Sequence, residues 1–230
     1  MSFLVQRARS TPDGLIPNKS TCFLYRQIPL QVYSYEMLFR KDQMKTISKI
    51  IDDVPVSSEI EETHVKIRKA LNAPFTPNFF QVWTISPESL NGIWPVMNHI
   101  LTSGRVGRKL KEMIFVAISS LRGCHYCEAA HHSFCLSIGV TPEQIDSLIN
   151  SYTADTADPK DKAAIDFAVR LAKDSHSSSE QDFQTLRELG FDDEEIMEII
   201  AMSGMGVFYT HLANATKINI DEGFIKKISE

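Results

Sequence analysis

The sequence has little of what marks membrane, extracellular and nucleic-acid-binding proteins. Its 4 cysteines are too few for a disulfide scaffold in a chain of 230 residues. Its 24 basic residues are outnumbered by 29 acidic ones, and a net charge of -5 gives no footprint for nucleic acid. No apolar run approaches the roughly 20 residues of a membrane-spanning helix. The N-terminal MSFLVQRARSTPDG lacks the apolar segment of a secretory signal, so we expect a cytoplasmic protein without membrane or nucleic-acid partners.

Strand signals are also missing, because no hairpin turn joins two segments of alternating polarity. Helix signals, in contrast, follow one another along most of the chain. They predict helices at Glu61–Leu71, from Ser86-Pro87 to about Ser103, at 106–121, at 124–138, after the Thr141-Pro142 capping box, after Asp158-Pro159, at Ser179–Leu189 and at Asp192–Lys217. The predicted fold class is therefore all-α.

Two levels of organisation are visible along the chain. Residues 1–57 contain prolines and an amphipathic segment at Tyr33–Val54, and predict an N-terminal arm that precedes a helical domain at 58–230. Within that domain, Ile138-Gly139-Val140-Thr141 returns 51 residues later as Leu189-Gly190-Phe191-Asp192. Each copy reads as a helix, a glycine cap, an N-cap and a second helix, which indicates a weak internal repeat.

The chemically reactive residues are concentrated in a C-x-x-C motif that is followed by a histidine. In a helix over 124–138, Cys124, Cys127 and His131 lie at i, i+3 and i+7 and share one face, which Phe134 and Ile138 continue. Both thiols would lie in the first turn, near unpaired N–H groups and the positive end of the helix dipole. We therefore expect the pKa of the Cys127 thiol to be lower than that of a free cysteine.

A carboxylate is expected beside this histidine. Glu112 lies ten residues before Arg122 and His131 nine after it, so the two meet if the helices on either side of the Arg122-Gly123 turn are antiparallel. A half-buried carboxylate needs such a partner. The spacing predicts a chain of proton carriers from Glu112 through His131 to Cys127.

This arrangement resembles the signature of the AhpD-like alkylhydroperoxidases, within the carboxymuconolactone decarboxylase superfamily. The resemblance covers roughly residues 60–220. It implies an all-helical AhpD-like bundle, homo-oligomers and thiol-based reduction of hydroperoxides without an organic cofactor or metal. By this resemblance Cys127 attacks the peroxide, Cys124 resolves the intermediate, and His131 and Glu112 relay protons. The chain departs from the well-known AhpD proteins at Tyr126, where they have a histidine, and looks more like the peroxidase-related branch.

Other interpretations of the same residues remain open. Cys124, Cys127 and His131 with Glu112 or His132 could hold zinc, although no second ligand pair lies at the usual spacing. The cysteines could also be an inert buried pair. Among the remaining candidates, His125 could tune the thiolates or be an exposed histidine, and Cys135 is more consistent with a small core residue.

The expected function is a thiol peroxidase of antioxidant defence that cycles between the Cys124/Cys127 dithiol and its disulfide. By resemblance, its electron donor is an external dithiol on a lipoylated or thioredoxin-like protein. The alternative is a non-enzymatic redox sensor or oligomeric binding protein that uses the same disulfide. The helix at Asp192–Lys217 is apolar on most sides, so we expect a homo-oligomer, a trimer or a multiple of it by resemblance.

Overall fold

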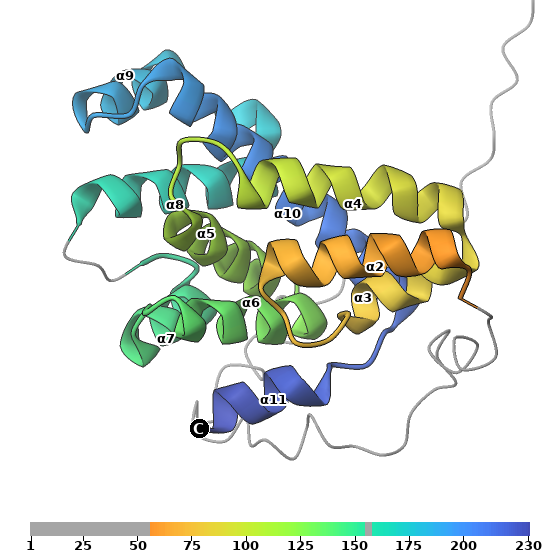
Figure 1. Ribbon diagram of the computed structural model, residues 1–230. Coiled ribbons are helices and arrows are strands. Elements are labelled where there is room, and N and C mark those ends of the chain that lie inside the picture. The colour runs from red at the N-terminus through yellow and green to blue at the C-terminus, as the bar shows by residue number, and fades with distance from the viewer. Residues whose placement is uncertain (1–55, 155–157) are drawn as a thin grey trace, which may run out of the picture. The chain divides into compact units, whose positions relative to one another are not determined.

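The computed structural model describes residues 56–154 and 158–230, and every regular element in these ranges is a helix (Figure 1). The all-α prediction is confirmed. The α-helices are α2 (Ser58–Leu71), α3 (Asn78–Val82), α4 (Pro87–Thr102), α5 (Arg108–Leu121), α6 (His125–Ser137), α7 (Pro142–Ser151), α8 (Pro159–Lys173), α9 (Glu180–Glu188), α10 (Asp193–Thr216) and α11 (Glu222–Ser229). Short 3-10 turns follow α3 (η3, Trp83–Ile85) and α8 (η4, Ser175–Ser177).

The predicted helix boundaries follow from local capping chemistry. The helices α7 and α10 both begin with a capping box, formed by Thr141 and Gln144 in α7. Gly139 and Gly190 close the preceding helices with φ of +79° and +88°, values that a glycine adopts without strain. The two copies of the predicted repeat therefore have the same local structure.

Helix α5 is the centre of the fold. Residues 110–119 are all buried, and the helix contacts α4, α6, α7, α8 and α10. Helices α5 and α6 are joined by a short turn in which Gly123 has a φ of +60°. This turn folds α6 back along α5, so the cysteine helix packs against the helix whose residues 110–119 are buried.

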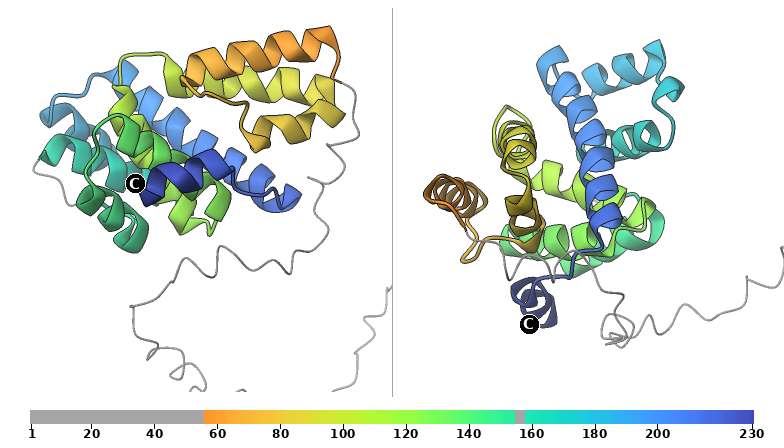
Figure 2. Two further views of the ribbon diagram at one scale, coloured as in Figure 1. Left: turned by 60° about the horizontal axis from the view of Figure 1, so that its bottom comes forward. Right: turned by 90° about the vertical axis from the view of Figure 1, so that its right-hand side faces the viewer.

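The sequence did not reveal α3 or α11, and both reach the cysteine helix. Helix α11 packs on α6, and Figure 2 shows it, in dark blue, lying across the green helices. Ring contacts join Phe224 of α11 to Tyr126 and Phe134 of α6, with centroid distances of 6.5 and 5.6 Å. The C-terminal segment is therefore part of the surroundings of the motif.

Helix α10 is the one helix in the described ranges that is long and apolar enough to cross a membrane. Half of the most apolar segment of α10 is buried inside the protein, and the helix packs on α4, α5 and α8. A core helix of a soluble protein has the same properties, and the packing of α10 on three other helices favours that interpretation. The cytoplasmic location stays a prediction.

The predicted N-terminal arm, residues 1–57, and its amphipathic segment Tyr33–Val54 lie almost entirely outside the described residues. Described structure begins at residue 56, and α2 begins at Ser58. The division into an arm and a domain at 58–230 stays a prediction.

Candidate active site

Cys124 is the N-cap of α6, and Cys127 lies in its first turn. The backbone N–H of Cys124 donates to the carbonyl of Ser119 at 2.9 Å, which ties the start of α6 to the end of α5. Both side chains are buried, with 1% and 3% exposure. The predicted helix and the predicted position of both thiols at its start are confirmed. The predicted continuation of a buried face to Ile138 is wrong, because Ile138 follows the last turn and is 41% exposed.

Glu112 and His131 are in direct contact. His131 Nδ1 lies 2.5 Å from Glu112 Oε2, and both side chains are buried. The contact confirms the register predicted from the Arg122-Gly123 turn. The His131 ring also stacks on Phe115, with centroids 3.6 Å apart and planes 13° apart. The imidazole is thus fixed by a hydrogen bond at one edge and a ring on one face.

Arg108 holds the other oxygen of the Glu112 carboxylate. Its Nε and Nη2 lie 2.6 and 2.5 Å from Glu112 Oε1. Burial by itself raises the pKa of Glu112. The hydrogen bond to His131, the charge of its ring whenever that ring is protonated, and the charge and hydrogen bond of Arg108 outweigh burial and hold the pKa below the ordinary value. Glu112 is therefore a carboxylate with a different partner on each oxygen. Sequence reasoning missed Arg108, although its i, i+4 spacing to Glu112 was a visible signal.

The ionisation of the cysteine pair differs from the prediction. Burial raises the pKa of the Cys127 thiol well above that of a free cysteine, and the neighbouring Cys124 adds to the effect. A hydrogen bond from Cys127 lowers the pKa of Cys124, against the effect of burial. The expectation of a low pKa at Cys127 is thus wrong, because the helix start does not offset the loss of solvent. Cys124 is the sulfur on which negative charge is favoured.

Cys127, the third member of the predicted relay, lies near His131 but is not hydrogen-bonded to it directly. Cys127 and His131 line the same cavity, yet no direct hydrogen bond joins them in the described part of the chain. The predicted convergence is therefore confirmed for Glu112 and His131 and stays a prediction for Cys127.

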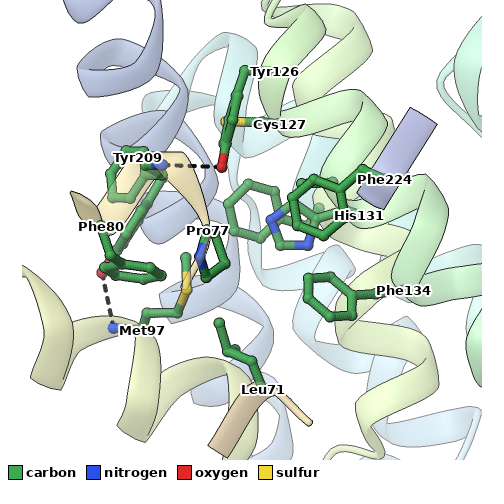
Figure 3. A pocket seen from close by; sticks show the side chains of 13 residues that line it. Leu71, Pro77, Phe80, Met97, Tyr126, Cys127, His131, Phe134, Tyr209 and Phe224 are labelled. Atoms are coloured by element: carbon green, nitrogen blue, oxygen red, sulfur yellow. Dashed lines mark hydrogen bonds between the residues drawn. The ribbon is translucent and has the colours of Figure 1, made fainter. Parts of the chain in front are cut away.

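The cavity has a volume of about 30 Å³, which is room for one or two water molecules. Figure 3 shows Tyr126 and Cys127 above it, His131, Phe134 and Phe224 on one side, and Tyr209, Phe80 and Met97 on the other. The remaining lining residues are Leu71, Pro77, Phe79, Phe115 and Ala130. Apart from Cys127 and His131, the walls are aromatic or aliphatic.

The polar atoms of the two tyrosines already have partners. The Tyr126 hydroxyl donates to Asp221 Oδ2 at 2.8 Å and accepts from the Phe79 N–H at 3.0 Å. The Tyr209 hydroxyl donates to the Ile93 carbonyl and accepts from the Met97 N–H. Cys127 and His131 are therefore the polar groups of the cavity that remain for chemistry.

The other histidines and cysteines named from the sequence lie outside this arrangement. His125 is exposed, and His132 is half-buried, with a pKa lowered by burial. Cys135 is fully buried, and burial raises its pKa. Within residues 56–154 and 158–230, no group of three or more histidine, cysteine or acidic side chains is placed to hold a metal ion.

Comparisons with known proteins find relatives that share the helical fold. Residues 87–170 match the carboxymuconolactone decarboxylase family. An uncharacterized peroxidase-related protein from Ralstonia eutropha JMP134, described as an alkylhydroperoxidase AhpD core, is 27% identical, with a TM-score of 0.67 over 74% of this chain and 93% of that one. No curated protein sequence matches the chain.

Two further solved structures share the fold at lower identity. A peroxidase-related protein from Silicibacter sp. TM1040 is 23% identical, with a TM-score of 0.71 over 81% of this chain and 97% of that one. The debrominase Bmp8 is 19% identical, with a TM-score of 0.62 over 75% of this chain and 91% of that one. A cysteine-to-alanine variant of Bmp8 was solved with 2,3,4-tribromopyrrole. At these identities the likeness is one of fold.

Proposed function

We propose that the chain is an AhpD-like, peroxidase-related member of the carboxymuconolactone decarboxylase superfamily, and that it reduces hydroperoxides with the Cys124/Cys127 dithiol. The observation that carries the proposal is the cavity in which Cys127 lies beside His131, itself bonded to Glu112. Such an enzyme would serve antioxidant defence.

In the first step the Cys127 sulfur attacks the terminal oxygen of the hydroperoxide, because Cys127 lines the cavity and Cys124 does not. Cys127 gives up its proton to His131, directly or through one water. An S–O bond forms, the O–O bond breaks, and the leaving alkoxide takes that proton as an alcohol. Cys127 is now a sulfenic acid.

In the second step Cys124 attacks the Cys127 sulfur. The hydrogen bond from Cys127 lowers the pKa of Cys124 and so favours its thiolate, which is the nucleophile in such an exchange. The S–S bond forms, the S–O bond breaks, and the hydroxide leaves as water after it takes the proton that the Cys124 thiol gave up. An external dithiol then reduces the disulfide and supplies the two electrons of the cycle. Since both sulfurs are buried, the donor has to reach them through an opening of the site.

The alternative function is a redox sensor that uses the same disulfide without turnover. A sensor needs only two sulfurs within bonding reach, whereas a peroxidase needs space beside one of them and a proton acceptor. The cavity at Cys127 and the His131–Glu112 pair favour the enzyme. Lactone decarboxylation is not favoured, because by resemblance those decarboxylases do not carry the C-x-x-C pair.

The test is consumption of an organic hydroperoxide with dihydrolipoamide or reduced thioredoxin as donor. We expect turnover by the wild type and loss of more than a hundredfold in Cys127→Ser, in proportion to the loss of the attacking group. Cys135→Ala removes a buried cysteine outside the cavity and serves as the control. In Cys124→Ser, a sulfenic acid trapped on Cys127 should accumulate. Equal turnover by wild type and Cys127→Ser, or debromination of tribromopyrrole without peroxide turnover, would contradict the proposal.

A further inference from the structure

Arg108 joins the buried pair to the protein surface. Its side chain is 28% exposed, whereas the side chains of Glu112 and His131 are 0% and 6% exposed. The guanidinium also lies 5.9 Å from the centre of the Phe134 ring, which lines the cavity. Arg108, Glu112 and His131 therefore form one continuous contact that starts near solvent and ends at the cavity.

The combined net charge of the Arg108, Glu112 and His131 side chains decides which protonation state is favoured. With a guanidinium, a carboxylate and a neutral imidazole, the buried group has no net charge, and one more proton would bring it to +1. Without the guanidinium, the same proton would bring the pair from -1 to zero. Placing uncompensated charge in a buried site is costly, so Arg108 opposes uptake of that proton by Glu112 or His131.

We propose that Arg108 is a positioning residue of the thiol site, which holds Glu112 as a carboxylate and His131 as a neutral imidazole with its proton on Nδ1. A carboxylate can only accept, so Nδ1 must be the donor in the 2.5 Å contact. In a neutral ring this leaves Nε2 as the acceptor. If Glu112 were protonated, it would donate to Nδ1, the ring proton would move to Nε2, and the proton acceptor for Cys127 would be lost.

The other ionisable groups near this contact do not replace Arg108. Lys109, the next residue on α5, is exposed, and Cys135 has its pKa raised by burial and is therefore a neutral thiol. On the cavity side, Phe115 and Phe134 contact the His131 ring, and Cys127 is held neutral by burial. Arg108 is the cation that contacts Glu112 in the described part of the chain.

The proposal builds on the thiol chemistry proposed above, but its test reads the His131 ring and needs no peroxide. The reduced full-length protein is labelled with ¹⁵N, and the two ring nitrogens of His131 are followed from pH 4 to 9. In the wild type we expect the neutral Nδ1–H ring over the upper part of this range. In Arg108→Gln that state should already be lost at a higher pH than in the wild type, by imidazolium formation or by transfer of the ring proton to Nε2.

Two further variants make the test specific. Lys109→Gln removes a neighbouring positive charge that does not contact Glu112, and should titrate like the wild type. Arg108→Lys keeps the charge but not the two-nitrogen contact, and should lie between the wild type and Arg108→Gln. If Arg108→Gln does not fold, the His131 titration of Arg108→Lys tests the proposal in its place. An unchanged His131 titration in the Arg108 variant that folds, or the same shift in Lys109→Gln, would overturn the proposal, whether or not the protein reduces peroxides.

Discussion

The hydroxyl of Tyr126 donates a hydrogen bond of 2.8 Å to Asp221, which lies 95 residues further along the chain. Asp221 also accepts from the Asn78 N–H, at 3.0 and 3.2 Å to its two oxygens, and is 6% exposed. These bonds tie α3, the cysteine helix α6 and the start of α11 to one carboxylate. Within the described residues, Asp221 accepts hydrogen bonds from neutral donors and forms no ion pair, so the position of the cavity wall depends on a buried carboxyl group that lacks a compensating cation there.

This carboxylate should make stability depend on pH. Burial raises the pKa of Asp221 to about 6 from 3.8. The folded state then favours the protonated form, so the contribution of this group is fully present below pH 4 and is lost as the pH rises through 6. The difference between 3.8 and about 6 corresponds to roughly 3 kcal/mol at most.

Denaturant unfolding of wild type and Asp221→Asn at pH 4, 5, 6 and 8 measures this effect. We compare how the free energy of unfolding changes with pH in each protein, because the substitution also alters hydrogen bonds at every pH. The wild type should lose about 1 to 3 kcal/mol more between pH 4 and 8 than Asp221→Asn does. Parallel pH curves for the two proteins would show that Asp221 has an ordinary pKa.

A second buried charge should contribute to stability through its partner. Lys111 is 1% exposed, and its ammonium lies 2.7 Å from Glu198. Glu198→Gln leaves this ammonium without a counter-charge and should lower the free energy of unfolding by about 3 kcal/mol. Asp166→Asn is the control, because it breaks the exposed Lys162–Asp166 pair and should cost less than about 1 kcal/mol. Equal effects of the two substitutions in chemical denaturation would refute the distinction.

The reduced cysteines should react in a defined order. Iodoacetamide followed by peptide mass mapping should show Cys124 modified before Cys127, because the thiolate is favoured at Cys124 and disfavoured at Cys127. Cys127→Ala removes the hydrogen bond that lowers the pKa of Cys124, so alkylation of Cys124 at pH 7 should slow several-fold. Cys127→Ser keeps a donor and should lie between them. Faster modification of Cys127 than of Cys124 in the wild type would contradict this assignment.

The contacts of the site differ in how far they can be predicted from the sequence. The Glu112–His131 contact could be predicted because it depends only on two helices and equal distances from one turn. Arg108 lies one helical turn before Glu112 and could have been found by the same reasoning. The role of Asp221 could not, because its partners come from α3 and α6 and no local pattern links them.

The ionisation of Cys127 was mispredicted for a related reason. The helix start is a local feature and is visible in the sequence, but burial is a tertiary one. Phe79 and Tyr126, which line the cavity with Cys127, come from α3 and α6, and Phe224 comes from α11. Two of these three helices, α3 and α11, were not predicted. The burial of the Cys127 sulfur therefore could not be predicted from the sequence either.

The last prediction concerns assembly. Helix α10 exposes large apolar side chains in the single chain, with Met197 63% and Phe208 40% exposed. Apolar surface of this kind on a central helix is typical of an interface, and we expect a homo-oligomer that covers it, a trimer or a multiple of it by family resemblance.

Light scattering of the full-length protein at micromolar concentration should report the oligomer, and Phe208→Glu should shift it to smaller species. Val65→Glu, at a residue of α2 that is 48% exposed, is the matched control and should leave the mass unchanged. Deletion of residues 1–57 should weaken assembly if the predicted arm reaches a neighbouring subunit, while α6 stays folded. A monomeric wild type, or dissociation by Val65→Glu as readily as by Phe208→Glu, would contradict an interface at α10.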